Sequence, residues 1–298
     1  KVIKVNTIYH GGKMSEIVYL NNQFVPKEQA NISVFDRGFL FADAVYEVTA
    51  VINGQLIDFE GHFQRLQRSC KALSMPFSLT KEQLKEIHGQ LIDKNHLHEG
   101  LIYLQVTRGA DSSRFFDFPS SSVAPTLVLF VQHSTVVNHP NASKGISVVS
   151  VEDIRWQRCD IKTVALLAAC LAKHHAHQQG ADDAIFIKES YITEGSSSNF
   201  FIVNQQDEII TRPLSQDILP GITRQAIIQL AKEQKLTIIE RLFTLEEAKQ
   251  AKEAFISSAT TLIWPVISID NEKINQGKVG ALSQRLREIY LEKAGVKP

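Results

Sequence analysis

The sequence has few cysteines, no excess of either charge and no long apolar run. Three cysteines in 298 residues, with no C-x-x-C pair, argue against a disulfide framework and a zinc ribbon and are typical of a reducing compartment. The 32 basic residues equal the 32 acidic ones, so the charge indicates neither a nucleic acid nor an anionic membrane as a partner. No apolar run has the length of a membrane span, and we expect no secretory signal. We therefore expect a cytoplasmic protein that binds small molecules.

Several common catalytic signatures are also missing. The sequence contains no G-x-G-x-x-G after a predicted strand, no P-loop and no G-x-S-x-G, so dinucleotide binding, P-loop chemistry and the α/β-hydrolase fold are not indicated. His174, His175 and His177 lie close together on a predicted helix, but no two of them have the i, i+4 spacing of a helical zinc pair. We interpret them as a solvated helix face and expect no metal site.

Strand and helix patterns are mixed along the chain without a regular strand–helix–strand repeat, which favours an α+β fold with two domains. The Asn53-Gly54 pair predicts a tight hairpin between strands at 45–52 and 55–58. Alternate residues of the first strand face opposite sides of its sheet. The face that we expect to line a pocket carries Glu47, Thr49 and Val51.

The other predicted elements divide the chain at a polar segment. Amphipathic helices are predicted at 59–73 and, after a Thr80 cap, up to residue 95. The polar residues 135–144 separate two apolar strands and predict an interdomain linker. The small N-terminal domain is then expected at 14–134 and the larger C-terminal domain at 145–298. Met14 resembles a natural start, so we expect residues 1–13 to lie outside the fold.

Lys162 lies between a predicted strand, 148–151, and a predicted helix, 164–179. Taken alone, a lysine in the first turn of a helix is most simply a surface residue. A lysine held among apolar neighbours and beside Arg155 and Arg158 would instead present a neutral amine as a nucleophile. The choice between the two interpretations depends on the rest of the chain.

Four other segments supply complementary chemistry. Residues 193–199 would ordinarily be a turn of small polar residues, but they also hold Glu194 among hydroxyl groups, where a carboxylate can bind a protonated ring nitrogen. Residues 219–224 are a glycine-bearing turn that opens a helix, whose free amides can bind an anion, and residues 257–261 add hydroxyls and amides. Arg65, on a predicted helix, is suited to a phosphate. Each segment alone is ordinary. Together with a lysine they are the groups that pyridoxal phosphate requires.

These and neighbouring motifs carry a resemblance to a known family. Over essentially all of 14–293 the sequence resembles the fold type IV (branched-chain aminotransferase-like, class IV) pyridoxal-phosphate enzymes, and within them the bacterial D-amino acid transaminase branch. The segments that carry the resemblance are 36–48, 62–66, 105–109, 153–162, 193–199 and 219–224. The resemblance implies a small N-terminal α/β domain, a larger C-terminal pseudo-barrel α/β domain and a homodimer with the active site at the subunit and domain interface.

The resemblance also implies the roles of individual residues. Lys162 would bind the cofactor covalently and move the proton during catalysis, and Glu194 would pair with the ring nitrogen. Arg114 would reach the substrate carboxylate from the neighbouring subunit. The remaining cofactor-binding residues would be Arg65, Ser198, Leu219, Ile222, Thr223, Ser258, Ala259 and Thr260. The remaining residues on the substrate side would be Tyr46, Val48 and Phe116.

The implied reaction moves an amino group between a D-amino acid such as D-alanine and a 2-oxo acid such as 2-oxoglutarate or pyruvate. Three departures bear on it: Phe116 stands where well-known members carry histidine, Ala50 stands for an expected lysine, and Ala259 stands for a phosphate-binding threonine. The close alternative is an (R)-selective amine transaminase or a dual enzyme. Branched-chain transamination and aminodeoxychorismate lysis are weaker fits. A non-catalytic vitamin-binding protein, or a hydrolase using residues 196–198, is the alternative from another class.

Overall fold

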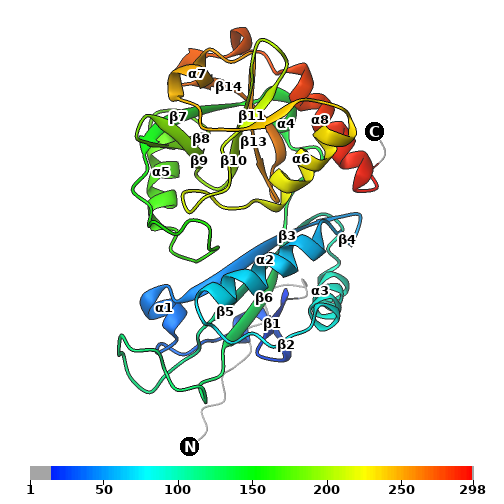
Figure 1. Ribbon diagram of the computed structural model, residues 1–298. Coiled ribbons are helices and arrows are strands. Elements are labelled where there is room, and N and C mark those ends of the chain that lie inside the picture. Colours follow the sequence, from blue (N-terminus) through cyan, green and yellow to red (C-terminus); the bar gives the residue numbers. More distant parts are fainter. Residues whose placement is uncertain (1–14, 297–298) are drawn as a thin grey trace, which may run out of the picture.

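The computed structural model of the chain describes residues 15–296, which form two sheets with helices packed on them (Figure 1). Met14 as the expected start, and the segment before it, lie outside the described residues. The first sheet has six strands in the order β2-β1-β6-β5-β3-β4, and every pairing in it is antiparallel. Its strands are β1 (Ile17–Leu20), β2 (Gln23–Pro26), β3 (Ala44–Ile52), β4 (Gln55–Leu56), β5 (Gly100–Thr107) and β6 (Thr126–His133).

Helices α2 (Phe59–Ala72) and α3 (Lys81–Asn95) pack against this sheet over a shared apolar core. The predicted Thr80 cap is confirmed, because its hydroxyl accepts from the Gln83 amide while the Gln83 side chain accepts from the Thr80 amide. The predicted hairpin is also confirmed, since Asn53 and Gly54 both have positive φ between β3 and β4. The short elements here are η1 (Lys27–Gln29) and α1 (Arg37–Phe41).

The second sheet has nine strands and mixes parallel with antiparallel pairs. Its order is β12-β11-β10-β13-β14-β7-β8-β9, with β15 paired to β14. The strands are β7 (Ile146–Glu152), β8 (Asp183–Lys188), β9 (Tyr191–Gly195), β10 (Asn199–Val203), β11 (Ile209–Thr211), β12 (Ile238–Glu240), β13 (Glu253–Ser258), β14 (Leu262–Ile269) and β15 (Glu272–Lys273). The helices are α4 (Pro140–Lys144), α5 (Leu167–Gln178), α6 (Ile222–Glu233), α7 (Leu245–Lys249), η2 (Asn275–Gly277) and α8 (Ala281–Lys293). The sheet curls into a half-barrel, so the expected α+β, fold type IV architecture is confirmed.

Two local expectations were wrong. Residues 193–195 were expected in a turn, but they belong to β9, which pairs antiparallel with β8 across a turn of two positive-φ residues, Glu189 and Ser190. Helix α5 begins at Leu167 and not at 164, because the chain just before it is held extended against β3. There Val164 donates to the Ala44 carbonyl at 3.2 Å. β-Branched residues favour this extended backbone over a helix.

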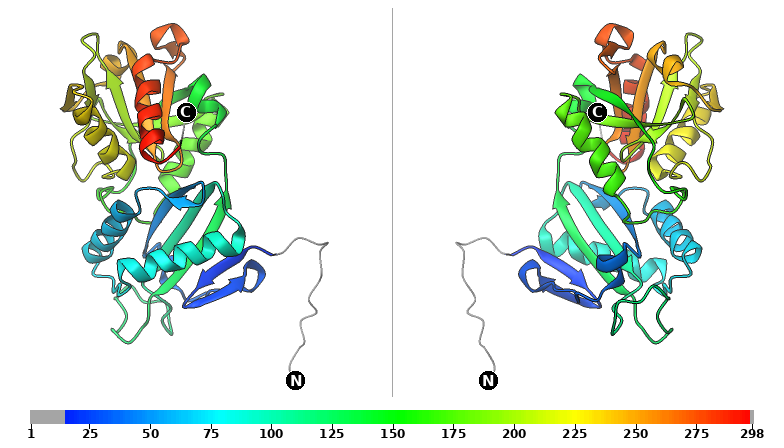
Figure 2. Two further views of the ribbon diagram at one scale, coloured as in Figure 1. Left: turned by 90° about the vertical axis from the view of Figure 1, so that its right-hand side faces the viewer. Right: turned by 90° about the vertical axis from the view of Figure 1, so that its left-hand side faces the viewer.

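A single segment connects the two sheets (Figure 2), and it is hydrogen-bonded to residues on both sides. The amides of Val136 and Val137 donate to Glu99, which precedes β5, at 2.6 and 2.7 Å. The carbonyls of the same two residues accept from Arg287 of α8 at 2.7 and 2.8 Å. The proposed linker, 135–144, contains this tied segment and the short helix α4. Among residues 15–296, no helix is both long enough and apolar enough to cross a membrane.

Candidate active site

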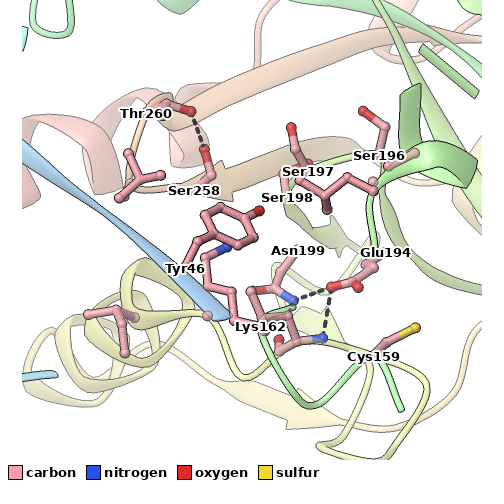
Figure 3. Close-up of a pocket in the computed structure, with 18 of the residues that line it drawn as sticks. Tyr46, Cys159, Lys162, Glu194, Ser196, Ser197, Ser198, Asn199, Ser258 and Thr260 are labelled. Carbon is pink, nitrogen blue, oxygen red and sulfur yellow. Dashed lines mark hydrogen bonds between the residues drawn. The ribbon is translucent and has the colours of Figure 1, made fainter. Parts of the chain in front are cut away.

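A cavity of about 270 Å³ is lined by residues of both sheets and their connections (Figure 3). From the first sheet and α2 come Tyr46, Val48, His62 and Arg65. The second part of the chain supplies the other walls through the segment before α5, the turn after β9, the start of α6 and the turn after β13. The cavity therefore gathers most of the residues singled out in the sequence, although they are spread over more than 200 positions of the chain.

Lys162 reaches the cavity because its backbone pairs with β3. The Tyr46 amide donates to the Lys162 carbonyl at 3.0 Å, and Val45 and Thr163 form a β-bridge. The lysine thus lies five residues before α5 and not in its first turn. Its Nζ lies 4.1 Å from the centre of the Tyr46 ring. Within the described residues the amine has no hydrogen bond or ion pair, so it is available to a bound molecule.

Glu194 is a buried carboxylate at the end of β9, and several donors hold it. Its Oε2 accepts from the Asn199 side chain at 3.0 Å and from the Leu219 amide at 3.1 Å, while Oε1 accepts from Arg155. Only 4% of the residue is exposed. Burial raises the pKa of Glu194, and the Arg155 guanidinium opposes that rise. A cation bound beside this carboxylate would add to the stabilisation of its ionised form.

The start of α6 lies on the cavity wall with its first amides uncapped. Gly221 is the N-cap residue and offers no side-chain cap, so the first amides of the helix stay available. A side chain at Gly221 would meet the Asn199 Oδ1 atom at 2.0 Å, so a larger residue there would displace the Asn199 side chain. Ile222 and Thr223 line the cavity beside it, as do Leu219, Ser258, Ala259 and Thr260.

Arg65 also lines the cavity, but most of its donors are already used. Its Nε and Nη2 bind Glu47 at 2.8 and 2.7 Å, and Nη1 donates to the Pro220 carbonyl at 3.1 Å. His62 contacts the same carboxylate at 2.7 Å. Burial alone would raise the pKa of Glu47, but Arg65 and His62 lower it to about 2. Glu47 is therefore ionised and holds Arg65 against the turn before α6.

The expected pocket face of β3 was wrong. Glu47 and Thr49 point away from the cavity toward α2, and it is Tyr46 and Val48 that line it. The predicted alternation is correct, but period 2 alone does not say which face a helix covers. Tyr46 and Val48, which the family resemblance places on the substrate side, line the cavity, and their contact with a substrate stays a prediction. Ala50 lies in an apolar core cluster and does not line the cavity.

Arg114 and Phe116 do not line this cavity. They belong to the exposed connection between β5 and β6, where the Arg114 guanidinium lies 4.9 Å from the Phe41 ring centre and 5.4 Å from that of Phe116. Phe116 is 78% exposed. Arg37 shapes the loop by donating to the backbone carbonyls of residues 115–117. The predicted role of Arg114 in a neighbouring subunit therefore stays a prediction.

The cavity fits a phosphorylated pyridine aldehyde in its chemistry. It offers an unengaged amine at Lys162, a buried carboxylate at Glu194 and helix amides beside Ile222. Two hydroxyls at its wall, of Ser198 and Ser257, are buried without a hydrogen-bond partner among the described residues. Buried polar atoms without partners are rare in native proteins, so these two hydroxyls are free to hydrogen-bond a molecule in the cavity.

The sequence reasoning did not identify the contacts of three residues at the site, Arg155, Asn199 and Glu47. Arg155 and Asn199 bind Glu194 directly, and Glu47 holds Arg65. All three lie in segments that carry the family resemblance, 153–162, 193–199 and 36–48. The sequence signal for these three residues was the motif in which each of them lies. Contacts between side chains of different segments leave no local pattern, so the motifs do not show which of their residues contact one another.

Comparison with known proteins is consistent with this geometry. The family model "Amino-transferase class IV" matches residues 44–269. The chain is 38% identical over 273 residues to a D-alanine aminotransferase of Staphylococcus aureus (strain N315), covering 92% of this chain and 96% of that protein. It is 36% identical to a D-alanine aminotransferase of Listeria monocytogenes serotype 1/2a (strain 10403S), with 92% and 95% covered.

The structure superimposes on the branched-chain amino acid aminotransferase of Escherichia coli with a TM-score of 0.85 at 24% identity, covering 94% of each chain. It also matches a T.th. branched-chain amino acid aminotransferase, solved with pyridoxamine 5′-phosphate, at a TM-score of 0.86 and 24% identity, covering 96% of each. At this identity the likeness establishes the fold alone. The family match over most of the chain and the relatives above 35% identity show more: the chain is an enzyme and belongs to the class IV aminotransferases.

Proposed function

We propose that this chain is a pyridoxal-phosphate-dependent transaminase that moves an amino group between a D-amino acid such as D-alanine and a 2-oxo acid such as 2-oxoglutarate or pyruvate. The observation that carries the proposal is the unengaged Lys162 amine in the same cavity as the buried Glu194 carboxylate and the open start of α6. D-Alanine aminotransferases at 35–38% identity over most of the chain support the choice of substrate.

The cavity residues divide into those that hold the cofactor and one that moves protons. Ile222 and Thr223 would bind the phosphate with the amides of α6, and Glu194 would hold a proton on the ring nitrogen. When bound, pyridoxal phosphate supplies an aldehyde that takes up the amino group and a ring that withdraws electrons. Lys162 would carry the cofactor and then, as a free base beside Tyr46, take a proton from one carbon and return it to another.

A second copy of the chain would complete the site. Arg114 lies outside the cavity of its own chain and contacts Phe41 and Phe116, in a loop where Phe115, Phe116 and Phe118 are 63%, 78% and 63% exposed. Exposed apolar side chains of this size commonly mark an interface. We therefore infer a homodimer in which Arg114 of one subunit reaches the substrate carboxylate in the other.

The alternative substrate class has its own supporting observation. The run Arg114-Phe115-Phe116 offers one cationic side chain and two phenylalanines exposed by more than 60%. A loop of this composition favours an apolar substituent at the expense of a second carboxylate contact. We therefore infer D-amino acid transamination as the main activity, with (R)-1-phenylethylamine as a slower donor.

Reduction with borohydride tests the assignment of the cofactor and its lysine together. The chain is incubated with pyridoxal phosphate, reduced and digested, and the modified peptide is located by mass spectrometry. The cofactor mass should appear on Lys162. Its appearance on a different lysine, or on none, would contradict the proposal. A panel of D- and L-amino acids and both enantiomers of 1-phenylethylamine then distinguishes a transaminase from a protein that only binds the vitamin.

A further inference from the structure

Arg155 is a charged residue of the cavity for which neither the resemblance nor the proposed reaction provides a role. It lies in the connection between β7 and α5, and its side chain is 12% exposed. Its Nη1 donates to Glu194 Oε1, on the carboxylate that would face the ring nitrogen. Arg155 therefore hydrogen-bonds the carboxylate of Glu194, the acidic residue that lines the cavity.

Asp153 fixes the direction of the Arg155 side chain. Its two carboxylate oxygens accept from Arg155 Nε at 2.9 Å and Nη2 at 2.7 Å. Asp153 itself is held by the Thr193 hydroxyl at 2.8 Å. The guanidinium also donates to the Asp217 carbonyl at 3.2 Å and lies 4.3 Å from the centre of the Phe186 ring. With these contacts made, Nη1 is directed at Glu194.

The charged groups around Glu194 leave a net negative charge, which suits a cation in the cavity. Asp153, Arg155 and Glu194 together carry two negative charges and one positive charge when ionised, so the group has a net charge of −1. Farther titratable groups contribute less, because Asp217 is paired with Lys188 and Arg212. The Cys159 thiol stays neutral, since burial raises its pKa to about 11. A pyridine ring protonated on nitrogen would neutralise the net charge.

We propose that Arg155, held by Asp153, is a positioning residue that keeps the Glu194 carboxylate ionised and oriented, so that the proton between Glu194 and a bound ring nitrogen lies on the nitrogen. This inference rests on the proposed function. The reason is the difference in distance from Arg155. The Arg155 guanidinium is hydrogen-bonded to the Glu194 carboxylate, whereas the ring nitrogen would lie on the far side of that carboxylate. The cation therefore stabilises the carboxylate more than it disfavours the protonated ring.

Removing the cation reverses the balance without changing the number of protons. Without Arg155, Glu194 is buried and faces Asp153 as a like charge, and both effects favour its protonated form. The same single proton then stays on the Glu194 oxygen, and the ring nitrogen accepts a hydrogen bond as a neutral base. A neutral ring withdraws electrons less well, so the proton-abstraction half-reaction slows.

The first arm of the test uses the chain reconstituted with ring-¹⁵N pyridoxal phosphate. In the parent, the ¹⁵N NMR shift should be that of a protonated pyridine, and in Arg155→Met it should move toward that of the unprotonated ring. Arg155→Lys should restore the parent shift in part. The matched control is Arg158→Met, which removes an arginine of the same connection that forms a partly exposed pair with Asp160. A protonated-ring shift in a folded Arg155→Met variant would overturn the proposal.

The second arm needs no cofactor, so it separates this proposal from the proposed function. The ¹³C NMR signal of the Glu194 carboxyl, assigned by its loss in Glu194→Gln, is titrated in the cofactor-free chain. Arg155→Met should raise the midpoint by roughly one pH unit or more, the size expected for losing an opposite charge in contact. An unchanged midpoint would overturn the proposal, whatever the chain does with pyridoxal phosphate. Should Arg155→Met not fold, Arg155→Gln, which is neutral but polar, takes its place in both arms and is judged by the same outcomes.

Discussion

Lys162 shows how backbone pairing brings a single side chain into a cavity. Its carbonyl accepts from Tyr46 and its neighbour Thr163 bridges Val45, so a lysine that has no distinctive local sequence context is placed over the Tyr46 ring inside the cavity. The side chain has no hydrogen bond to lose within the described residues. Its removal is therefore expected to affect chemistry far more than folding.

Lys162→Ala should lose transaminase turnover by several orders of magnitude, as removal of a covalent catalyst does. Its thermal unfolding midpoint without cofactor should stay within a few degrees of the parent. The measurement is steady-state turnover together with a melting curve. Lys173→Ala is the control, because Lys173 lies on α5, does not line the cavity and pairs with Asp183 of β8. Parent-like turnover in Lys162→Ala would contradict the assigned role.

His88 makes the stability of the chain depend on pH. The ring is buried against Phe59, and burial lowers the pKa of His88 to about 4, although a bond at 2.8 Å to the Leu84 carbonyl opposes this. In the unfolded chain a histidine titrates near 6.5. Between roughly pH 6.5 and pH 4 the unfolded chain therefore binds a proton that the folded chain does not, and stability falls as the pH falls through this window.

His88→Gln should remove that dependence. Between pH 7 and pH 5 the parent should lose about 2 kcal/mol in free energy of unfolding through this group, and the variant should lose less by that amount. Urea denaturation at the two pH values measures the difference. The control His98→Gln changes an exposed histidine and should behave like the parent. Equal pH dependence in His88→Gln and the parent would show that His88 is protonated in the folded state.

We expect substrate choice to depend on the connection between β5 and β6. Arg114, Phe115 and Phe116 are exposed in the single chain, and Arg37 donates to the backbone carbonyls of residues 115–117. The loop is therefore shaped within its own chain before any partner binds. A substitution at an exposed side chain of such a loop should change recognition and leave the fold intact.

Phe116→His should raise the ratio of D-alanine turnover to (R)-1-phenylethylamine turnover by about tenfold or more, because a charge-assisted hydrogen bond to a carboxylate is worth on the order of 1.5–3 kcal/mol. The measurement is kcat/KM for both donors with a common acceptor. Phe118→His is the matched control from the same loop, because the Phe118 ring packs on Arg108, with its centre 3.7 Å from the Arg108 Cζ atom. Ratios that stay equal in both variants and the parent would mean that this loop does not set the substrate class.

Most elements were predictable from local patterns, and the exceptions have a common cause. The Asn53-Gly54 turn, the Thr80 cap and the apolar periodicity of α2 are local signals, and the structure confirms them. Strand β9, the late start of α5 and the orientation of Glu47 toward α2 depend on contacts with β8, β3 and α2. A sequence pattern gives the period of an element, but it does not give the neighbour that the element pairs with.

The site was predictable in its chemistry and less so in its pairings. Lys162, Glu194 and the start of α6 come together in one cavity, as the sequence reasoning required. Arg65, in contrast, is bound largely to Glu47, and Arg155 hydrogen-bonds Glu194. No sequence pattern indicated the contact between Arg155 and Glu194. Such buried pairs join positions far apart in sequence and can be identified only once the fold is known.

At the scale of the molecule, the cavity depends on how the two sheets are joined. Arg287 of α8 is 7% exposed and donates to four carbonyls: those of Val136 and Val137 in the connection, and those of Thr261 and Ile263 around β14. Burial without a carboxylate partner lowers its pKa to about 10, so it stays charged near neutral pH. Because the turn after β13 lines the cavity, the hydrogen bonds of Arg287 also support the site.

Arg287→Met should uncouple the two parts of the chain. Both tryptophans, Trp156 and Trp264, lie in the second part, so their fluorescence reports that part while far-ultraviolet circular dichroism reports both. In the parent the two urea transitions should coincide; in the variant the fluorescence transition should separate from the other. Arg285→Met, an exposed change on the same helix, should leave them coincident. Coincident transitions in Arg287→Met would rule out a coupling role.

The central claim is that this chain transfers an amino group from D-amino acids by way of Lys162, and the enantiomer of the product tests it most directly. The chain, loaded with pyridoxal phosphate, is given 2-oxoglutarate with ¹⁵N-labelled D-alanine or L-alanine, and the glutamate formed is analysed by chiral chromatography and mass spectrometry. We predict ¹⁵N-labelled D-glutamate from D-alanine, and from L-alanine no more label than Lys162→Ala produces. Labelled L-glutamate from L-alanine as the main product, or no labelled glutamate from D-alanine, would contradict the account.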